Sequence, residues 1–134
     1  MGAVDIQQSV YMAKKTSRVT CVVADDDPMM VSLWEEYMPL IRNVDVVASA
    51  SCGDDAGPVI LEQDPTFAVL DWNMPPGDGI EAARVARLGG YTGPIILVSG
   101  EDEFQIPEDL ADVWLAPKSA GPDGLTRVLD ELGV

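Results

Sequence analysis

Phe67-Ala68-Val69-Leu70-Asp71-Trp72-Asn73-Met74-Pro75-Pro76-Gly77-Asp78-Gly79 is the stretch that decides the fold. Its first four residues are apolar and predict a short buried strand. The strand ends on the carboxylate of Asp71, and the prolines and glycines that follow predict a turn. A second apolar run, residues 19–24, ends on Asp25, Asp26 and Asp27. Because open parallel sheets bind ligands at the carboxyl ends of their strands, we expect these acids to form one pocket.

Apolar runs alternate along the chain with stretches of helical periodicity. The predicted strands are residues 19–24, 44–50, 67–70, 95–98 and 113–116, and the second is expected at a sheet edge. Asp27 and Pro28 predict a helix start, and Pro39 is expected to kink this helix or end it early. Further helices are predicted over residues 54–63, 80–88 and from about Leu125 to Leu132. The alternation predicts an α/β, doubly wound, five-stranded parallel sheet with helices on both faces.

Length and composition limit the class of protein. The 134 residues fit one domain, with residues 1–17 as a tail or a short extra helix and residues 18–134 as the folded unit. The net charge of −15 argues against nucleic acid and anionic membrane surfaces as partners. The chain has no histidine, which excludes His-based catalysis and a histidine phosphocarrier. Without a membrane-length apolar stretch or a secretory signal pattern, the protein is expected to be cytoplasmic.

The acid pair Asp25-Asp26, the run from Asp71 to Pro75 and the Asp78-Gly79 pair together resemble the CheY-like receiver domain of bacterial response regulators. The resemblance covers roughly residues 18–134 and implies the strand order 2-1-3-4-5. It implies a signalling domain that promotes only its own phosphorylation and dephosphorylation, and that is otherwise not an enzyme.

The predicted pocket has a chemistry of its own. Three converging carboxylates repel one another, and a hard divalent cation relieves that repulsion. The resemblance implies Mg²⁺, or Mn²⁺, held by Asp25, Asp26, Asp71 and the backbone carbonyl of Asn73. It also implies that Asp71 attacks an activated phosphoryl group and becomes an aspartyl phosphate. For Asp27, a structural role as the cap of the following helix fits better than it does for Asp25 and Asp26.

Three more residues match the receiver pattern, and two features depart from it. Ser99 and Lys118 are expected to bind the phosphoryl group, and Trp114 matches the switch position or is a core aromatic. The family usually has Lys-Pro where this chain has Pro117-Lys118. The reversed order could turn Lys118 away from the pocket, or a cis Ala116–Pro117 bond could compensate. The segment 101–112 is acidic and short, so the fourth crossover helix is expected to be short or irregular.

The resemblance favours a stand-alone receiver in a two-component pathway. Its donor would be a sensor histidine kinase or a histidine phosphotransfer protein, and its output an unidentified downstream protein. The oligomeric state, monomer or dimer, stays open, as does the question of whether the chain is part of a longer regulator. One alternative is a degenerate receiver that acts as a phosphorylation-independent interaction module. The other is a Mg²⁺-dependent phosphatase, although Asn73 stands where such enzymes usually carry a second aspartate.

Overall fold

Five parallel strands form a single sheet in the order β2-β1-β3-β4-β5 in the computed structural model of this protein. The structure describes residues 18–100 and 105–134, so the expectation for residues 1–17 lies outside it. Within these ranges, no helix is long and apolar enough to cross a membrane. The elements along the chain are β1 (Thr20–Ala24), α2 (Pro28–Arg42), β2 (Asp45–Ala50), α3 (Gly53–Gln63), β3 (Phe67–Asp71), α4 (Gly79–Leu88), β4 (Ile95–Ser99), β5 (Val113–Pro117), the 3₁₀ turn Lys118–Ala120 and α5 (Gly121–Leu132).

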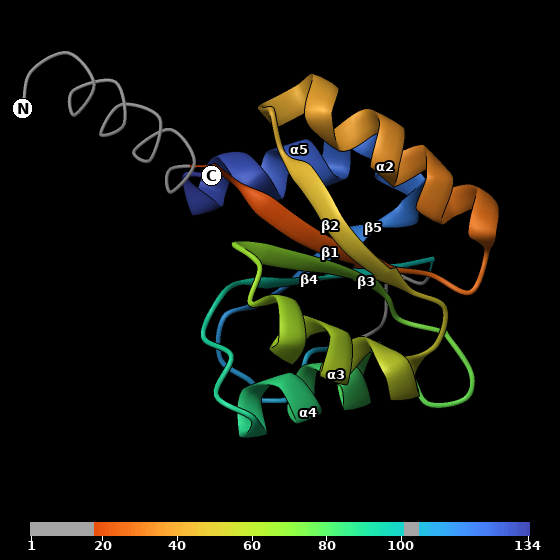
Figure 1. Cartoon of the computed structure of the whole chain (residues 1–134), viewed down its shortest axis with the longest axis vertical. Coiled ribbons are helices and arrows are strands. Elements are labelled where there is room, and N and C mark those ends of the chain that lie inside the picture. The colour runs from red at the N-terminus through yellow and green to blue at the C-terminus, as the bar shows by residue number, and fades with distance from the viewer. Residues whose placement is uncertain (1–17, 101–104) are drawn as a thin grey trace, which may run out of the picture.

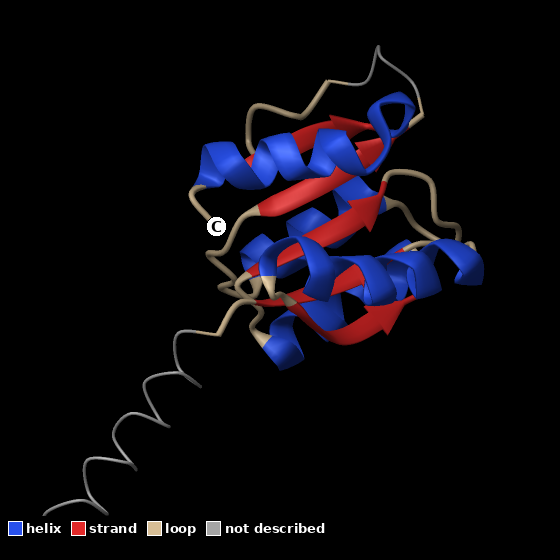
Figure 2. Ribbon diagram, turned by 90° about the horizontal axis from the view of Figure 1, so that it is seen from above, coloured by secondary structure: helices blue, strands red, loops and turns tan. Residues whose placement is uncertain are grey.

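The sheet is the middle layer of three. Helices α2 and α5 cover one face, and α3 and α4 cover the other (Figure 1). Figure 2 shows the same layers from above, with the strands lying side by side. The predicted fold class and strand order are therefore confirmed, and β2 lies at an edge as expected.

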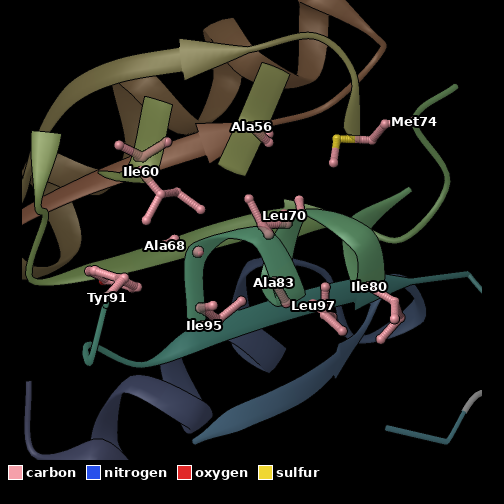
Figure 3. Packing of buried hydrophobic residues seen from close by; sticks show 14 of the residues in the cluster. Ala56, Ile60, Ala68, Leu70, Met74, Ile80, Ala83, Tyr91, Ile95 and Leu97 are labelled. Carbon is pink, nitrogen blue, oxygen red and sulfur yellow. The ribbon is translucent and has the colours of Figure 1, made fainter. Parts of the chain in front are cut away.

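Each face of the sheet has its own apolar core. Against α3 and α4, the side chains of Leu70 and Leu97 pack with Ile60 and Ala83, and Tyr91 closes one end of this cluster (Figure 3). Against α2 and α5, the second cluster is built from Trp34, Met38, Val69, Ile96, Leu125 and Leu129. Strands β3 and β4 are buried along their whole length, which explains why they are apolar up to their last residues, Asp71 and Ser99.

Helix α2 starts as predicted and continues past Pro39. The Asp27 side chain accepts a hydrogen bond from the Met29 N–H at 2.9 Å, and Pro28 occupies the first turn. Of the two expectations for Pro39, the early end is wrong, because the helix runs on to Arg42, and the kink stays a prediction. A proline inside a helix removes one hydrogen bond. The fully buried Met38 just before it keeps the helix packed on the sheet, which explains why the helix continues.

The crossover from β4 to β5 contains no helix in its described part, residues 105–112. In Figure 2 it is a loop that returns along the sheet. Leu110 is buried in the cluster beneath α4, and Ile106 packs against that cluster. These two residues are the contribution of the crossover to the apolar core on that face.

Candidate functional site

Three aspartates come together at the carboxyl edge of the sheet. Asp25 follows β1 directly, Asp26 comes next, and Asp71 is the last residue of β3. One carboxylate oxygen from each lies within 4.8 Å of the others. Asp25 and Asp71 keep only 4% and 5% of their surface exposed, whereas Asp26 is exposed. The acidic pocket that the sequence predicted is therefore present in the structure.

Strand register explains why these acids meet. Ala24 of β1 pairs with Leu70 of β3, so the residues that follow them, Asp25 and Asp71, leave the sheet at the same level. The Asp25 N–H donates to the Ala50 carbonyl at 3.1 Å, which holds the end of β1 against β2. The Asp27 N–H donates to Oδ1 of Asp25 at 2.9 Å and so fixes the orientation of that carboxylate.

Burial in the pocket disfavours the charged form of Asp25. Burial, with the nearby charge of Asp71, raises the pKa of Asp25 from 3.8 to about 6, although the Asp27 N–H acts in the opposite direction. A buried carboxylate beside another is stabilised by a proton or by a cation. The donor set consists of carboxylate oxygens and nearby carbonyls, which are the ligands that Mg²⁺ and Mn²⁺ prefer. These residues therefore fit a hard divalent ion.

Lys118 reaches the pocket despite the reversed Pro117-Lys118 order. Its Nζ lies 3.1 Å from Oδ1 of Asp71. No cis Ala116–Pro117 bond is needed, since the cis bond of the described chain is Pro75–Pro76. Pro117 completes β5 as the partner of Ser99, and Lys118 opens the 3₁₀ turn that follows.

Ser99 ends β4 and is almost fully buried, with 1% of its surface exposed. In the sheet, Asp71 pairs with Val98, and Ser99 pairs with Pro117. Ser99 therefore lies one residue beyond the sheet partner of Asp71. Lys118 likewise lies one residue beyond the sheet partner of Ser99. Trp114 is half-buried on the edge strand β5 and packs against the core beneath α2 and α5.

The loop after Asp71 is held by the start of α3. The N–H groups of Gly53 and Asp54 donate to the carbonyls of Met74 and Pro76, at 2.8 and 3.1 Å. Asn73 forms an isolated antiparallel bridge with Asp78, whose side chain caps α4 by accepting from the Glu81 N–H. This closed loop holds the Asn73 backbone close to the end of β3, and its role as a carbonyl ligand stays a prediction.

Sequence reasoning missed residues whose role depends on distant parts of the chain. A Cβ on Gly79 would lie 2.6 Å from the Asp71 carbonyl oxygen, so only glycine allows α4 to start this close to the site. A Cβ on Gly53 would lie 2.2 Å from the Asp78 backbone. Arg87 contacts the β4–β5 crossover. The glycines were visible as breakers, but only the fold shows what approaches them.

Comparison with known proteins agrees with this geometry. The model of the response regulator receiver domain family matches residues 21–113, which is more than half of the chain. The protein therefore belongs to the response regulator receiver domain family. Such domains are signalling modules of two-component systems and interact with histidine kinases.

Individual relatives lead to the same family. The probable transcriptional regulatory protein NarL of Mycobacterium tuberculosis is 33% identical over 117 residues, which are 84% of this chain and 54% of that protein. The probable C4-dicarboxylate response regulator DctR of Bacillus subtilis is 31% identical over 88 residues, 66% of this chain and 38% of that protein. The solved signal receiver domain of M. tuberculosis NarL superposes with a TM-score of 0.74 at 27% identity, covering 86% of this chain and 95% of that domain. The chain thus spans about half the length of NarL, or less in the case of DctR.

Proposed function

We propose that Asp71 accepts a phosphoryl group and that the resulting aspartyl phosphate controls the shape of the domain. One observation carries the proposal: the buried Asp71 carboxylate lies close both to an acid pair and to the ammonium of Lys118. A lone structural aspartate at a strand end needs neither neighbour. Together they supply ligands for a metal ion and a cation for an incoming phosphoryl group.

The transfer step assigns a role to each side chain. A carboxylate oxygen of Asp71 attacks the phosphorus of a phosphohistidine, the P–N bond breaks, and its electron pair stays on the imidazole nitrogen. A Mg²⁺ or Mn²⁺ ion held by Asp25, Asp26, Asp71 and the Asn73 carbonyl would neutralise charge on the transferred oxygens. Asp25 is held in place by its bond from the Asp27 N–H, so this ligand is oriented before the donor arrives.

Ser99 and Lys118 act on the product. Lys118 now pairs with an oxygen of Asp71, and after transfer the phosphoryl oxygens offer it more negative charge. The Ser99 hydroxyl, at the end of the neighbouring strand, donates to the same group. These contacts draw the ends of β4 and β5 together, and Trp114 on β5 follows. A ligand shifts such an equilibrium only by its differential contacts with the two states.

The partners follow from this chemistry. The donor is a sensor histidine kinase or a histidine phosphotransfer protein, and the phosphorylated surface binds a downstream protein. The acidic charge of −15 opposes direct contact of this domain with nucleic acid. The relative NarL is named a probable transcriptional regulatory protein and is longer than this chain, so contact with DNA through another segment is the competing possibility.

A second candidate function is a receiver that docks without phosphorylation. The observation that favours it is the β4–β5 crossover, which has no helix in its described part. In receivers this region, with β5 and α5, commonly contacts the partner. A protein that binds its partner through a different surface does not need a phosphorylation-dependent change of shape in this region.

One experiment decides between the two. The protein is incubated with acetyl phosphate and Mg²⁺, and intact mass is measured for the wild type, Asp71→Asn and Glu131→Gln. Glu131 is an exposed acid of α5, so its variant controls for the loss of one negative charge. The proposal expects one phosphoryl mass on the wild type and on Glu131→Gln, and none on Asp71→Asn. Full labelling of Asp71→Asn contradicts the assignment, and no labelling of the wild type favours the docking module.

A further inference from the structure

Arg87, near the end of α4, binds the crossover just before β5. Its guanidinium donates to three backbone carbonyls: Nε to Ala111 at 3.0 Å, Nη1 to Tyr91 at 2.9 Å and Nη2 to Asp112 at 3.0 Å. A planar fork of donors can bridge several carbonyls at once, which a lysine ammonium cannot do in the same geometry. Arg87 thus joins the segments that lead into β4 and into β5.

The residue next to β5 has an unusual conformation. Asp112 has φ = 55°, in the left-handed region that side chains other than glycine rarely adopt. Its carbonyl accepts from both the Ile95 N–H of β4 and Nη2 of Arg87, each at 3.0 Å. The sharp turn into β5 is therefore fixed by one bond from the sheet and one from α4.

Arg87 is itself anchored. Its guanidinium carbon lies 5.5 Å from the centre of the Tyr91 ring, and Tyr91 is buried with its hydroxyl donating to the Pro65 carbonyl at 3.0 Å. One turn earlier on α4, Arg84 makes a two-point ion pair with Asp109, but both side chains are largely exposed. Exposed pairs contribute little, so we assign the main role to Arg87.

Strand β5 needs such an anchor. It is an edge strand that pairs only with β4 in the sheet, and the described part of its crossover has no helix. Arg87 binds the residue just before the start of β5. The residue just after the end of β5 is Lys118, which pairs with Asp71. A strand of five residues spans only about 17 Å, so the turn that Arg87 binds and Lys118 lie at the two ends of one short strand.

We propose that Arg87 is a positioning residue for Lys118. It fixes the turn at Asp112, the turn sets the position of β5 against β4, and β5 places the Lys118 ammonium on Asp71. This inference rests on the proposed function, because it names what holds the phosphoryl-binding lysine in place. It assigns to α4 and the crossover loop the support that a crossover helix would provide.

The first test uses metal-free protein and amide hydrogen exchange. In Arg87→Ala and Arg87→Lys, the amides of Val113 to Ala116 and of Lys118 should exchange faster than in the wild type, with Ala116 and Lys118 reporting on the end of β5 because Pro117 has no N–H. Arg127→Ala, which removes an exposed arginine of α5, is the charge-matched control and should leave β5 unchanged. Faster exchange confined to the start of β5 would show that Arg87 does not hold Lys118 in place, and would overturn the inference.

The second test is a double-mutant cycle read by calorimetric titration with Mg²⁺. Lys118 competes with the ion for Asp71, so Lys118→Ala should tighten Mg²⁺ binding by at least about threefold. Arg87→Ala should tighten it in the same direction, because the displaced lysine competes less. In the Lys118→Ala background, the Arg87 substitution should have no further effect.

The outcomes separate this inference from the proposed function. If Arg87→Ala changes Mg²⁺ affinity equally in both backgrounds, its role is general to the fold and not exerted through Lys118. If it changes nothing in either background, Arg87 does not position the lysine. If the wild type binds no Mg²⁺, the proposed function fails, and the exchange at Lys118 alone decides whether Arg87 positions it. Arg87→Lys keeps the charge and serves as the milder variant should Arg87→Ala not fold.

Discussion

The ammonium of Lys118 lies 3.1 Å from a carboxylate oxygen of Asp71, although a proline stands where receivers usually carry the lysine. Pro117 is the last residue of β5 and Lys118 the first of the 3₁₀ turn that follows, so the lysine still lies at the carboxyl edge of the sheet. Asp71 is 5% exposed, whereas the lysine side chain is 42% exposed. The buried acid is therefore fixed, and the lysine is the partner that can move.

Lys118→Ala should separate phosphorylation from the change of shape. Asp71 and the metal ligands carry the transfer, so labelling by acetyl phosphate should be slower but measurable. One charge-assisted contact contributes about 1.5–3 kcal/mol, enough to bias a two-state equilibrium. Amide exchange around Ser99 and Trp114 should then be alike with and without phosphorylation in the variant. A full phosphorylation-dependent change in Lys118→Ala would show that another group performs the switch.

Mg²⁺ should stabilise the fold through the three aspartates. At ten times its dissociation constant, a ligand that binds only the folded state adds about 1.4 kcal/mol. The melting temperature should rise with Mg²⁺, and the rise should shrink in Asp26→Asn but not in Glu131→Gln. The quantity to compare is the metal-dependent increase, because removing one acid can stabilise the metal-free pocket by itself. Equal increases in Asp26→Asn and the wild type would remove Asp26 from the ligand set.

The metal-free protein should lose stability as the pH rises from about 4 to about 6. Burial raises the pKa of Asp25 from 3.8 to about 6, so the folded state holds this proton more tightly than the unfolded chain does. Above that window the charged, buried Asp25 lowers the free energy of unfolding by an amount on the order of 2–3 kcal/mol.

Asp25→Asn is the direct check of that pH dependence. Asparagine keeps an oxygen for the Asp27 N–H but does not titrate, so this part of the pH dependence should disappear. Urea unfolding in a chelating buffer at pH 4, 5, 6 and 7 measures it, with Glu131→Gln as the control. The same slope in Asp25→Asn and the wild type would contradict the role of burial at this site.

Trp72 should report metal binding by its fluorescence. It follows Asp71 directly and is half-buried, whereas Trp34 lies on α2 and Trp114 on β5. Addition of Mg²⁺ should change the emission of the wild type, and Trp72→Phe should remove most of that change. Retention of the full response in Trp72→Phe would assign the signal to one of the other two indoles.

Gly79→Ala should be strongly destabilising. The added Cβ would lie 2.6 Å from the Asp71 carbonyl oxygen and 2.9 Å from the Leu97 side chain. Relief of such overpacking moves the start of α4 and typically costs about 1–3 kcal/mol. Gly100→Ala is the matched control, because its Cβ would meet no atom closer than 3.9 Å. Chemical denaturation of both variants tests the difference, and equal stability would show that α4 can shift without cost.

The sequence predicted what local patterns can carry. The apolar runs located the strands to within one or two residues, and the acids at their ends located the pocket, because strand order places those ends together. It left open whether α2 ends at Pro39 or continues past it, since that depends on the packing of residues such as the buried Met38. Nor could it predict that Arg87 binds carbonyls more than twenty positions away, because a helix-surface arginine has the same pattern whatever it contacts.

Lys118 is the only lysine in the part of the chain that the structure describes, since the other two are at positions 14 and 15. This makes the acidic pocket chemically addressable. An amine-selective reagent has one target in the described fold, and its rate of reaction there depends on how tightly the ammonium is held by Asp71 or by whatever group replaces that partner. A protease that cleaves after lysine likewise has the single bond Lys118–Ser119 to cut in this region. Ordinary labelling or digestion can therefore read the state of the pocket without any engineered probe.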